Sequence, residues 1–417
     1  MKIFNSIFCK SSIPLTKFQE YIVKIIKNTG PMNINTYMRE ILTHPEHGYY
    51  TNRHVFGADG DFITSPEISQ MFGELIGIWI YNEWNYQQKP QPFHIVELGP
   101  GKGSLMHDAL IAISKFPELI EIISIKFVEV SENLRKTQQQ SLQIGFQKLQ
   151  REVPIDWFDD LNQIPTGVAS CFIANEFFDA LPIHKFKRNS NGKWREILVD
   201  HMSSVSGDDD SLRFVLAIKD TPATLAFRNV NLPLFIYHLL LIFLQVLDQL
   251  PSFLNDFEYS PISLSILDSI SIRIFESGGF ALIADYGHSG EKGDTLRAFK
   301  NHKLSNPLEN LGESDITTDV DFGVLESHLN RNFADKLFVI GPISQNMFLK
   351  NMGINVRLQM LLKNCKSKAE WDSLIWSYRI MMDPQEMGDR FKFISILPAL
   401  MNCYRGKYLP AGFRDLM

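Results

Sequence analysis

Cysteine is scarce in this chain, and closely spaced cysteines are missing from it. The 417 residues include four cysteines, at positions 9, 171, 365 and 403, and none lies close to another in the sequence. Cysteines paired at short spacing would indicate a zinc site or a redox motif. We therefore expect no metal and no redox motif. Scattered cysteines in a chain of this length are typical of a reducing compartment.

Excess positive charge is also lacking. Lysine and arginine number 41 against 47 acidic residues, which gives a formal net charge of −6. Proteins that bind nucleic acid usually carry a basic stripe or patch, so nucleic acid is not expected as a partner. A mildly acidic protein is better suited to a basic protein segment. Hydrophobic residues make up 45% of the chain, which is enough for a sizeable core.

Long apolar runs are absent apart from one stretch at residues 229–256. Its apolar run, between Asn231 and Leu250, is shorter than the roughly 18–20 uninterrupted apolar residues of a membrane span, and it contains His238 and Gln245. We therefore favour a buried or surface-docked helix over a membrane span. An insertion without a defined role, or a translated intron, are the alternatives that the sequence leaves open.

The N-terminal residues 1–14 have the composition of a mitochondrial presequence. They carry lysines and hydroxyl side chains, the apolar residues have helical spacing, and no acidic residue precedes Glu20. A frayed N-terminus without a targeting role is the alternative. Residues 15–90 follow with helical periodicity that is interrupted at Gly30 and Pro31, and they predict an N-terminal helical cap.

A regular alternation of strands and helices begins after this cap. Short apolar runs at 93–98, 125–130, 168–174 and 279–284 are separated by helical stretches, a pattern that predicts a parallel, doubly wound α/β sheet. Residues 184–187 and 194–199 flank a turn and predict a hairpin. We assign residues 91–417 to this Rossmann-like core, with a hairpin or small subdomain inserted at about residues 184–265.

A glycine-rich turn follows the first of these strands. Gly99, Gly101 and Gly103 lie between strand and helix, where glycine lets the backbone approach a ligand closely. The spacing is neither that of the dinucleotide fingerprint nor that of a Walker A loop. Glu97 precedes the glycines, and its charge suits the ammonium of S-adenosylmethionine better than a pyrophosphate. This arrangement resembles the cofactor loop of class I methyltransferases.

A second acidic residue, Glu129, ends the next strand. A carboxylate at that position can accept hydrogen bonds from both hydroxyls of a ribose. Together with the glycine turn it predicts S-adenosylmethionine as the cofactor. A solvated carboxylate at a strand end is the alternative for Glu129.

The third clear strand ends at a polar segment that contains Asn175, Glu176 and Asp179. Ligands of open α/β sheets bind beyond the carboxyl ends of the strands, which places these side chains at the catalytic edge. Carboxylates there can hold a guanidinium by paired hydrogen bonds, and they can orient a nitrogen or take its proton. Helix capping is the alternative, and it suits Asp179 better than Glu176.

Four segments, in order, resemble the family of mitochondrial complex I assembly factor 7, the MidA proteins. They are residues 60–74 (GDFITSPEISQMFGE), 96–103 (VELGPGKG), 175–182 (NEFFDALP) and 284–288 (ADYGH). The similarity extends from about residue 20 to about residue 400, apart from the apolar stretch. It implies a seven-stranded class I fold and symmetric dimethylation of an arginine in the 49 kDa-type core subunit of complex I. It also implies that the protein acts in the mitochondrial matrix and supports complex I assembly.

The resemblance carries over to individual residues in different degrees. The three glycines and Glu129 match the cofactor motif, with Glu97 and Asn175 as further cofactor-binding candidates, while Glu176 and Asp179 are the catalytic candidates. The substrate-side candidates are Thr64, Ser65, Glu67, Asp285 and His288. A capping box formed by Ser65 and Glu67 is the alternative for that segment, and His288 is as well suited to a structural role as to that of a base.

The sequence thus predicts a type II protein-arginine methyltransferase that uses S-adenosylmethionine and requires no metal. It leaves the oligomeric state open, with a homodimer as one option. Two rival functions remain at this point: a methyltransferase with a different acceptor, and an assembly factor that keeps the fold as a scaffold. Fold and cofactor site do not identify the acceptor.

Overall fold

The computed structural model describes residues 16–52, 64–149, 152–202, 211–228, 254–399 and 409–414. Residues 1–14, the first part of the 60–74 segment and residues 229–253 of the apolar stretch lie outside this description. The predictions made for them are therefore not tested here. Within the described residues, no helix is long and apolar enough to cross a membrane.

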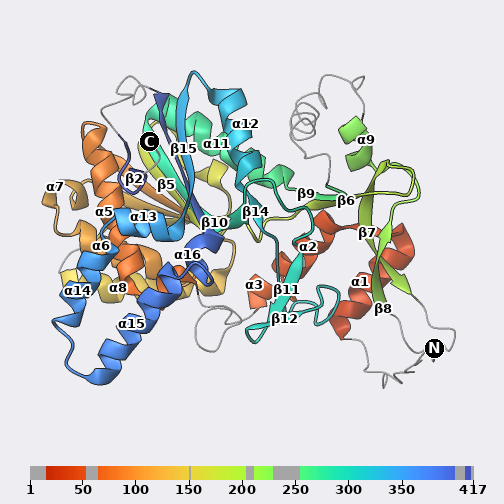
Figure 1. Ribbon diagram of the computed structural model, residues 1–417, viewed down its shortest axis with the longest axis horizontal. Coiled ribbons are helices and arrows are strands. Elements are labelled where there is room, and N and C mark those ends of the chain that lie inside the picture. Colours follow the sequence, from red (N-terminus) through yellow and green to blue (C-terminus); the bar gives the residue numbers. More distant parts are fainter. Residues whose placement is uncertain are drawn as a thin grey trace.

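An eight-stranded sheet forms the larger part of the molecule (Figure 1). Its spatial order is β15-β16-β10-β5-β2-β3-β4, and β14 (Val320–Asp321) also pairs with β10. The five strands from β10 to β4 are parallel, and β16 runs antiparallel to both of its neighbours. The strand bounds are β2 (Phe93–Leu98), β3 (Ile123–Val128), β4 (Ile155–Phe158), β5 (Ala169–Asn175), β10 (Gly279–His288), β15 (Leu337–Ser344) and β16 (Phe391–Pro398).

Helices cover both faces of this sheet, as the sequence pattern predicts for a doubly wound fold. Alternate side chains of β2 enter two different cores: Phe93 and Ile95 pack with one set of helices, Val96 and Leu98 with the other. The first set is α5 (Gln70–Tyr86), α6 (Ser104–Ile113), α8 (Glu132–Leu149), α13 (Gln345–Asn351), α14 (Ile354–Leu362) and α15 (Lys368–Met382). The second set is α11 (Pro261–Ser277) and α12 (Phe322–Phe333).

A second, smaller body stands beside the large sheet (Figure 1). The predicted hairpin is confirmed as β6 and β7, which pair antiparallel in a sheet of their own. This sheet has the order β1-β7-β6-β9, with β8 on β7. Its strands are β1 (Met32–Asn33), β6 (His184–Arg188), β7 (Trp194–Met202), β8 (Ser211–Leu216) and β9 (Asp256–Tyr259); α9 (Pro222–Arg228) follows β8.

The N-terminal helices pack on this smaller sheet. Residues from α1 (Lys17–Thr29) and α2 (Ile34–Thr43) share a core with Val199 and with a three-stranded sheet of β11 (Arg297–Lys300), β12 (Lys303–Ser305) and β13 (Asp315–Thr317). α5 lies instead against the large sheet, where Trp79 packs edge-on against Phe280. The residues expected to form one N-terminal cap therefore lie in two places.

The chain order of the strands reverses between β2 and β5. From β2 the sheet continues through β3 to β4 in one direction and through β5 to β10 in the other. Loops at the carboxyl ends of these two strands diverge to opposite faces, which opens a crevice at the end of the sheet. The glycine turn follows β2, and the polar segment beginning at Asn175 follows β5.

Candidate active site

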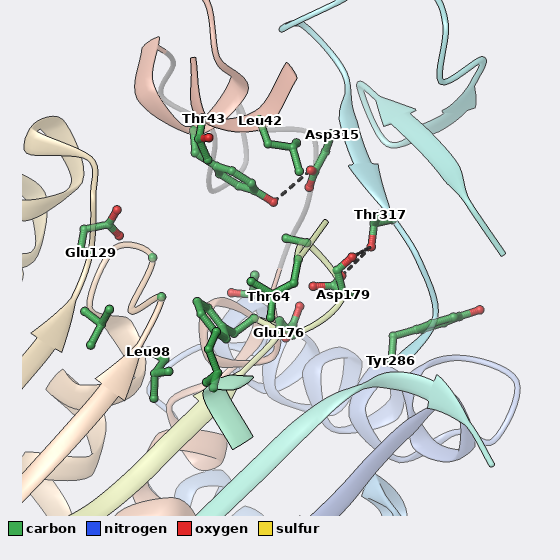
Figure 2. Close-up of a pocket in the computed structure, with 18 of the residues that line it drawn as sticks. Leu42, Thr43, Thr64, Leu98, Glu129, Glu176, Asp179, Tyr286, Asp315 and Thr317 are labelled. Carbon is green, nitrogen blue, oxygen red and sulfur yellow. Dashed lines mark hydrogen bonds between the residues drawn. The ribbon is translucent and has the colours of Figure 1, made fainter. Parts of the chain in front are cut away.

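A cavity of about 970 Å³ lies at this crevice. The glycine turn and Glu129 form one side, and Glu176, Asp179, Tyr286 and Asp315 form the other (Figure 2). Leu42, Thr43 and Tyr50 reach it from the smaller body, so both bodies contribute to its walls. This volume lies at the upper end of the range of about 300–1,000 Å³ found for small-molecule sites.

The glycine turn has a backbone that requires glycine. Gly99, Gly101 and Gly103 have φ angles of 62°, 54° and 80°, in the left-handed region that other residues rarely adopt. A Cβ atom on Gly99 would lie 2.7 Å from the ring of Phe177. Gly103 is the N-cap residue of α6. Two of the three glycines, Gly99 and Gly101, line the cavity directly.

Glu129 follows β3 and is held in place by hydrogen bonds. One carboxylate oxygen accepts from the Ser131 amide at 2.8 Å, and the other accepts from the side chain of Gln138 at 3.2 Å. Gln138 also donates to the carbonyl of Gly101 at 2.8 Å. Burial raises the pKa of Glu129. Gln138 thus ties the acidic residue to the glycine turn, a link that local sequence patterns do not reveal.

Glu97 lies just behind the glycine turn rather than in the cavity wall. Its side chain is 3% exposed, and burial raises its pKa to about 8. Among the described residues, its Oε2 atom has no hydrogen-bond partner. A buried acceptor without a partner is costly unless a ligand supplies a donor. An ammonium group held at the turn would supply that donor only where it reaches Glu97 behind the turn.

A fourth segment of the cofactor side was not identified from the sequence. Asp159, Asp160, Leu161 and Asn162 follow β4 and line the cavity. The Asp160 side chain caps the short helix η1 (Leu161–Gln163) by accepting from the Asn162 amide. Their place beyond the end of a parallel strand is the signal that could have identified them.

Glu176 lies directly after β5 on the acidic side of the cavity. Its φ angle is 51°, an uncommon value for a residue with a side chain. Its Oε1 atom accepts from the Ser65 amide at 2.8 Å and from the Asn175 side chain at 3.3 Å. Burial raises the pKa of Glu176 to about 7. The strained backbone and the hydrogen bonds together direct this carboxylate into the cavity.

Asp179 lies beside Glu176 in the cavity wall (Figure 2). Its carboxylate accepts from the Thr317 hydroxyl at 2.7 Å, and its carbonyl accepts from the Thr318 amide. Burial raises the pKa of Asp179, while Arg297 opposes that shift. Asp179 does not cap a helix, because no helix follows it directly.

The substrate-side candidates separate into different places. Thr64 lines the cavity, whereas Ser65 is buried and Glu67 forms an ion pair with Lys102 of the glycine turn at 3.6 Å. All three lie at or in α4 (Ser65–Ile68). Thr64 is the N-cap residue of this helix and makes no side-chain capping bond, so the capping box of Ser65 with Glu67 is not formed.

Asp285 and His288 are not among the residues that line this cavity. Asp285 is fully buried, and its Oδ2 atom accepts from the amides of Phe177, Phe178 and Asp179 at 2.8–3.3 Å. It therefore supports the turn that carries the two catalytic candidates. His288 borders a separate, smaller pocket, and its Nδ1 accepts from the Gly290 amide.

Several further cavity residues were not identified from the sequence, and of these only Tyr286 lies in a motif segment (residues 284–288). The Tyr50 hydroxyl donates to Asp315 at 3.0 Å, and the Arg297 guanidinium lies 4.7 Å from the ring centre of Tyr286. All four line the cavity on its acidic side. They come from α3 (Tyr49–Asn52), β13, β11 and β10, which the fold brings together.

Comparison with known proteins identifies the family of this chain. The model of a family described as "Putative S-adenosyl-L-methionine-dependent methyltransferase" matches residues 75–340. A human (Homo sapiens) relative named "Protein arginine methyltransferase NDUFAF7, mitochondrial" is 40% identical over 413 residues, covering 95% of this chain and 87% of the relative. The Drosophila melanogaster homolog is 39% identical over 403 residues, covering 93% and 86% of the two chains.

Solved structures confirm the class I methyltransferase fold. A protein from Burkholderia thailandensis, bound to S-adenosyl-homocysteine, superposes with a TM-score of 0.71 at 20% sequence identity. The match covers 96% of this chain and 94% of that protein. S-Adenosylmethionine is the cofactor, and the buried acceptor of Glu97 beside the glycine turn fits its ammonium group. The chain belongs to the NDUFAF7 family of S-adenosylmethionine-dependent methyltransferases.

Proposed function

We propose that this protein methylates arginine in another protein. The observation that carries the proposal is that Glu176 and Asp179 line the same cavity as the glycine turn and Glu129. Two neighbouring carboxylates match the geometry of a guanidinium, which donates paired hydrogen bonds. The relatives' names, which specify arginine as the acceptor, support the same assignment.

The residues on the two sides of the cavity bind different reactants. Glu129, the glycine turn and Glu97 would hold S-adenosylmethionine, which supplies an electrophilic methyl group when bound. Glu176 and Asp179 hold the acceptor guanidinium and restrict its rotation, so that one nitrogen faces the cofactor side. Ser65 and Asn175 keep the Glu176 carboxylate oriented.

Glu176 is also the group best suited to accept a proton. As the nitrogen gains a methyl group it must lose one N–H proton, because otherwise the product would carry an additional charge. A carboxylate with a pKa of about 7 is matched to that transfer near neutral pH. Asp179 stabilises the remaining positive charge of the guanidinium.

We further propose that the acceptor is the 49 kDa-type core subunit of complex I, and that its arginine is dimethylated symmetrically in the mitochondrial matrix. The support is the resemblance carried by the four sequence segments, together with relatives named mitochondrial. Residues 1–14 would direct import. An import assay with isolated mitochondria, comparing the full chain with a chain that lacks residues 1–14, tests that part separately.

The deciding experiment is mass spectrometry of complex I arginines from cells with and without this protein. We expect one arginine of the 49 kDa-type subunit to lose its symmetric dimethylation when the protein is absent, and to regain it with the wild-type chain. Loss of complex I with all arginine methylation retained would contradict the proposal and favour a scaffold. Asymmetric or single methylation would contradict the symmetric assignment only.

A further inference from the structure

One wall of the cavity lies outside the residues to which we assigned the cofactor and the guanidinium. It is formed by Trp376, Ile380, Met387 and Phe391, which line the cavity from α15, α16 (Met387–Arg390) and the start of β16. We call these four residues the apolar wall. Glu386 and Arg390 line the cavity beside it and are exposed.

Trp376 differs from the other members of the wall because half of its surface is exposed. Its relative exposure is 51%, whereas Phe391 is buried. Trp376 and Ile380 are four residues apart and therefore lie on the same face of α15. A tryptophan that lines a reaction cavity and also faces solvent presents apolar area at the cavity entrance. Such a residue, with polar neighbours at its edge, is typical of the centre of a protein interface.

Two hydrogen bonds hold the helix that carries Trp376, both at residues that follow it. The hydroxyl of Ser377 donates to the carbonyl of Ile68 at 2.9 Å, and the carbonyl of Met381 accepts from the buried Gln345 side chain at 3.0 Å. The first bond attaches α15 to α4. The amide of Ser65, in the same α4, donates to Glu176.

α4 thus contacts both the helix that carries Trp376 and the carboxylate of Glu176, and it fixes their relative positions. A segment whose arginine reaches Glu176 must place its neighbouring residues along the entrance that Trp376 borders. A free amino acid or a small metabolite would have no residue to place there. Phe391 of the wall packs edge-on against Tyr286 of the acceptor side, with 5.7 Å between the ring centres. Because the wall adjoins the acceptor side in this way, the occupant that it fits is the acceptor protein itself.

We propose that the apolar wall is the docking surface for the residues that flank the acceptor arginine, with an apolar side chain of the acceptor packed on Trp376. This inference rests on the proposed arginine methyltransferase function. It adds a determinant of substrate selection that lies outside the cofactor and guanidinium sites. Glu386 and Arg390 then form a polar rim around the contact.

The chain offers a matched control for Trp376. Trp371 lies on the same helix with a similar exposure of 44%, but it does not line the cavity. We would measure methyl transfer from S-adenosylmethionine to the purified 49 kDa-type subunit over a range of subunit concentrations. The variants are Trp376→Ala, Trp376→Phe and Trp371→Ala in the full chain.

Trp376→Ala should raise the KM for the subunit by about tenfold or more, as expected for loss of an aromatic interface residue. Its kcat and its affinity for S-adenosylhomocysteine should stay within about twofold of wild type, because the wall holds neither reacting group. Trp376→Phe should recover most of the affinity for the subunit, and Trp371→Ala should behave like wild type.

Equal KM values for Trp376→Ala and Trp371→Ala would overturn the inference while leaving the function intact. Equal losses of methyl transfer in Trp376→Ala and Trp371→Ala would also overturn it, since they would indicate general destabilisation of α15. If Trp376→Ala does not fold, Trp376→Gln takes its place, because it keeps a longer side chain but removes the aromatic surface. A docking role predicts a raised KM for Trp376→Gln and not for Trp371→Ala. No transfer by the wild-type chain would instead contradict the proposed function, and the inference with it.

Discussion

Glu176 combines a half-buried position, a left-handed backbone and a pKa of about 7 in one residue. Each of these is unfavourable for a carboxylate that serves only as structure. Hydrogen bonds from Ser65 and Asn175 oppose the shift and still leave the carboxylate lining the cavity. This conjunction is the physical reason for placing the acceptor nitrogen beside Glu176, and it makes the residue accessible to a direct test.

Glu176→Gln keeps the shape of the side chain but removes its charge. We expect methyl transfer to fall by about a hundredfold or more, because both the grip on the guanidinium and the proton acceptor are lost. The affinity for S-adenosylhomocysteine, measured by calorimetry, should change by less than about threefold. Equal losses of activity and cofactor affinity would place Glu176 on the cofactor side instead.

The same residue should govern the acidic limb of the pH profile. In the proposed reaction Glu176 acts in its charged form, and its pKa in the free protein is raised to about 7. As the pH falls below 7 the carboxyl becomes protonated, so kcat/KM should fall about tenfold per unit. The Glu176→Gln variant should lack this limb. A wild-type profile that is flat between pH 5.5 and 7.5 would be incompatible with the assignment.

Glu97 allows a pH-dependent test of cofactor binding rather than of activity. Burial raises its pKa to about 8, so the carboxyl is largely protonated at pH 7 in the free protein. Binding an ammonium group requires the charged form, and the proton must then leave. Affinity for S-adenosylhomocysteine should therefore rise as the pH increases from 6 to 8.

Calorimetry in two buffers of different ionisation enthalpy measures this proton release. We expect a release approaching one proton at pH 6.5 for the wild-type chain and a smaller release for Glu97→Gln. A wild-type release that is unchanged in Glu97→Gln would show that another group carries the proton.

At the scale of elements, the glycine turn is the feature whose function depends most on backbone shape. Gly101 has a φ of 54° and lines the cavity, and its carbonyl is held by Gln138. A β-branched side chain there is strained and also fills space that the ligand needs. Gly101→Val should abolish measurable binding of S-adenosylhomocysteine while the protein remains folded.

Gly167 supplies the control for backbone strain. Its φ is 87°, and no atom lies within 4 Å of the position that a Cβ would take. Gly167→Val should cost stability by a similar strain, seen as a lower Tm, and should leave cofactor binding unchanged. If both variants lose binding equally, strain and not the shape of the turn accounts for the effect.

The sequence predicted those elements whose signals are local. The glycine turn, Glu129 and Glu176 each follow a short apolar strand, and a strand end is readable from adjacent residues. Asp315, Tyr50 and Trp376 carry no such signal, because they reach the cavity only through the packing of distant segments. For Asp285 the local signal was misleading, because the strand that was expected to end at residue 284 continues as β10 to His288. Asp285 therefore lies within the strand and accepts a hydrogen bond from the turn that carries Glu176 and Asp179.

α4 shows how few contacts can connect separate parts of a site. This four-residue helix meets the glycine turn through Glu67 and Lys102, the acceptor side through Ser65 and Glu176, and α15 through Ile68 and Ser377. Its own hydrogen bonds are too few to make it stable alone. It is therefore ordered by its neighbours, and it relates their positions to one another.

In the whole molecule, the cavity has two halves with different chemistry. The glycine turn, Glu129 and the segment after β4 form the cofactor half, which belongs to the large sheet. The acceptor half draws on the large sheet, the smaller body and the C-terminal helices together. A ligand that fills one half should therefore stabilise one set of segments and not the other.

Hydrogen exchange can separate these halves. Saturating S-adenosylhomocysteine should slow exchange at residues 98–104, 129–138 and 159–162, because these segments surround the cofactor half. Exchange in α15 and α16 should stay unchanged until the 49 kDa-type subunit is added, since only the acceptor reaches the apolar wall. Protection of α15 and α16 by the cofactor alone would contradict this division, because it would mean that cofactor binding already orders the acceptor half through α4.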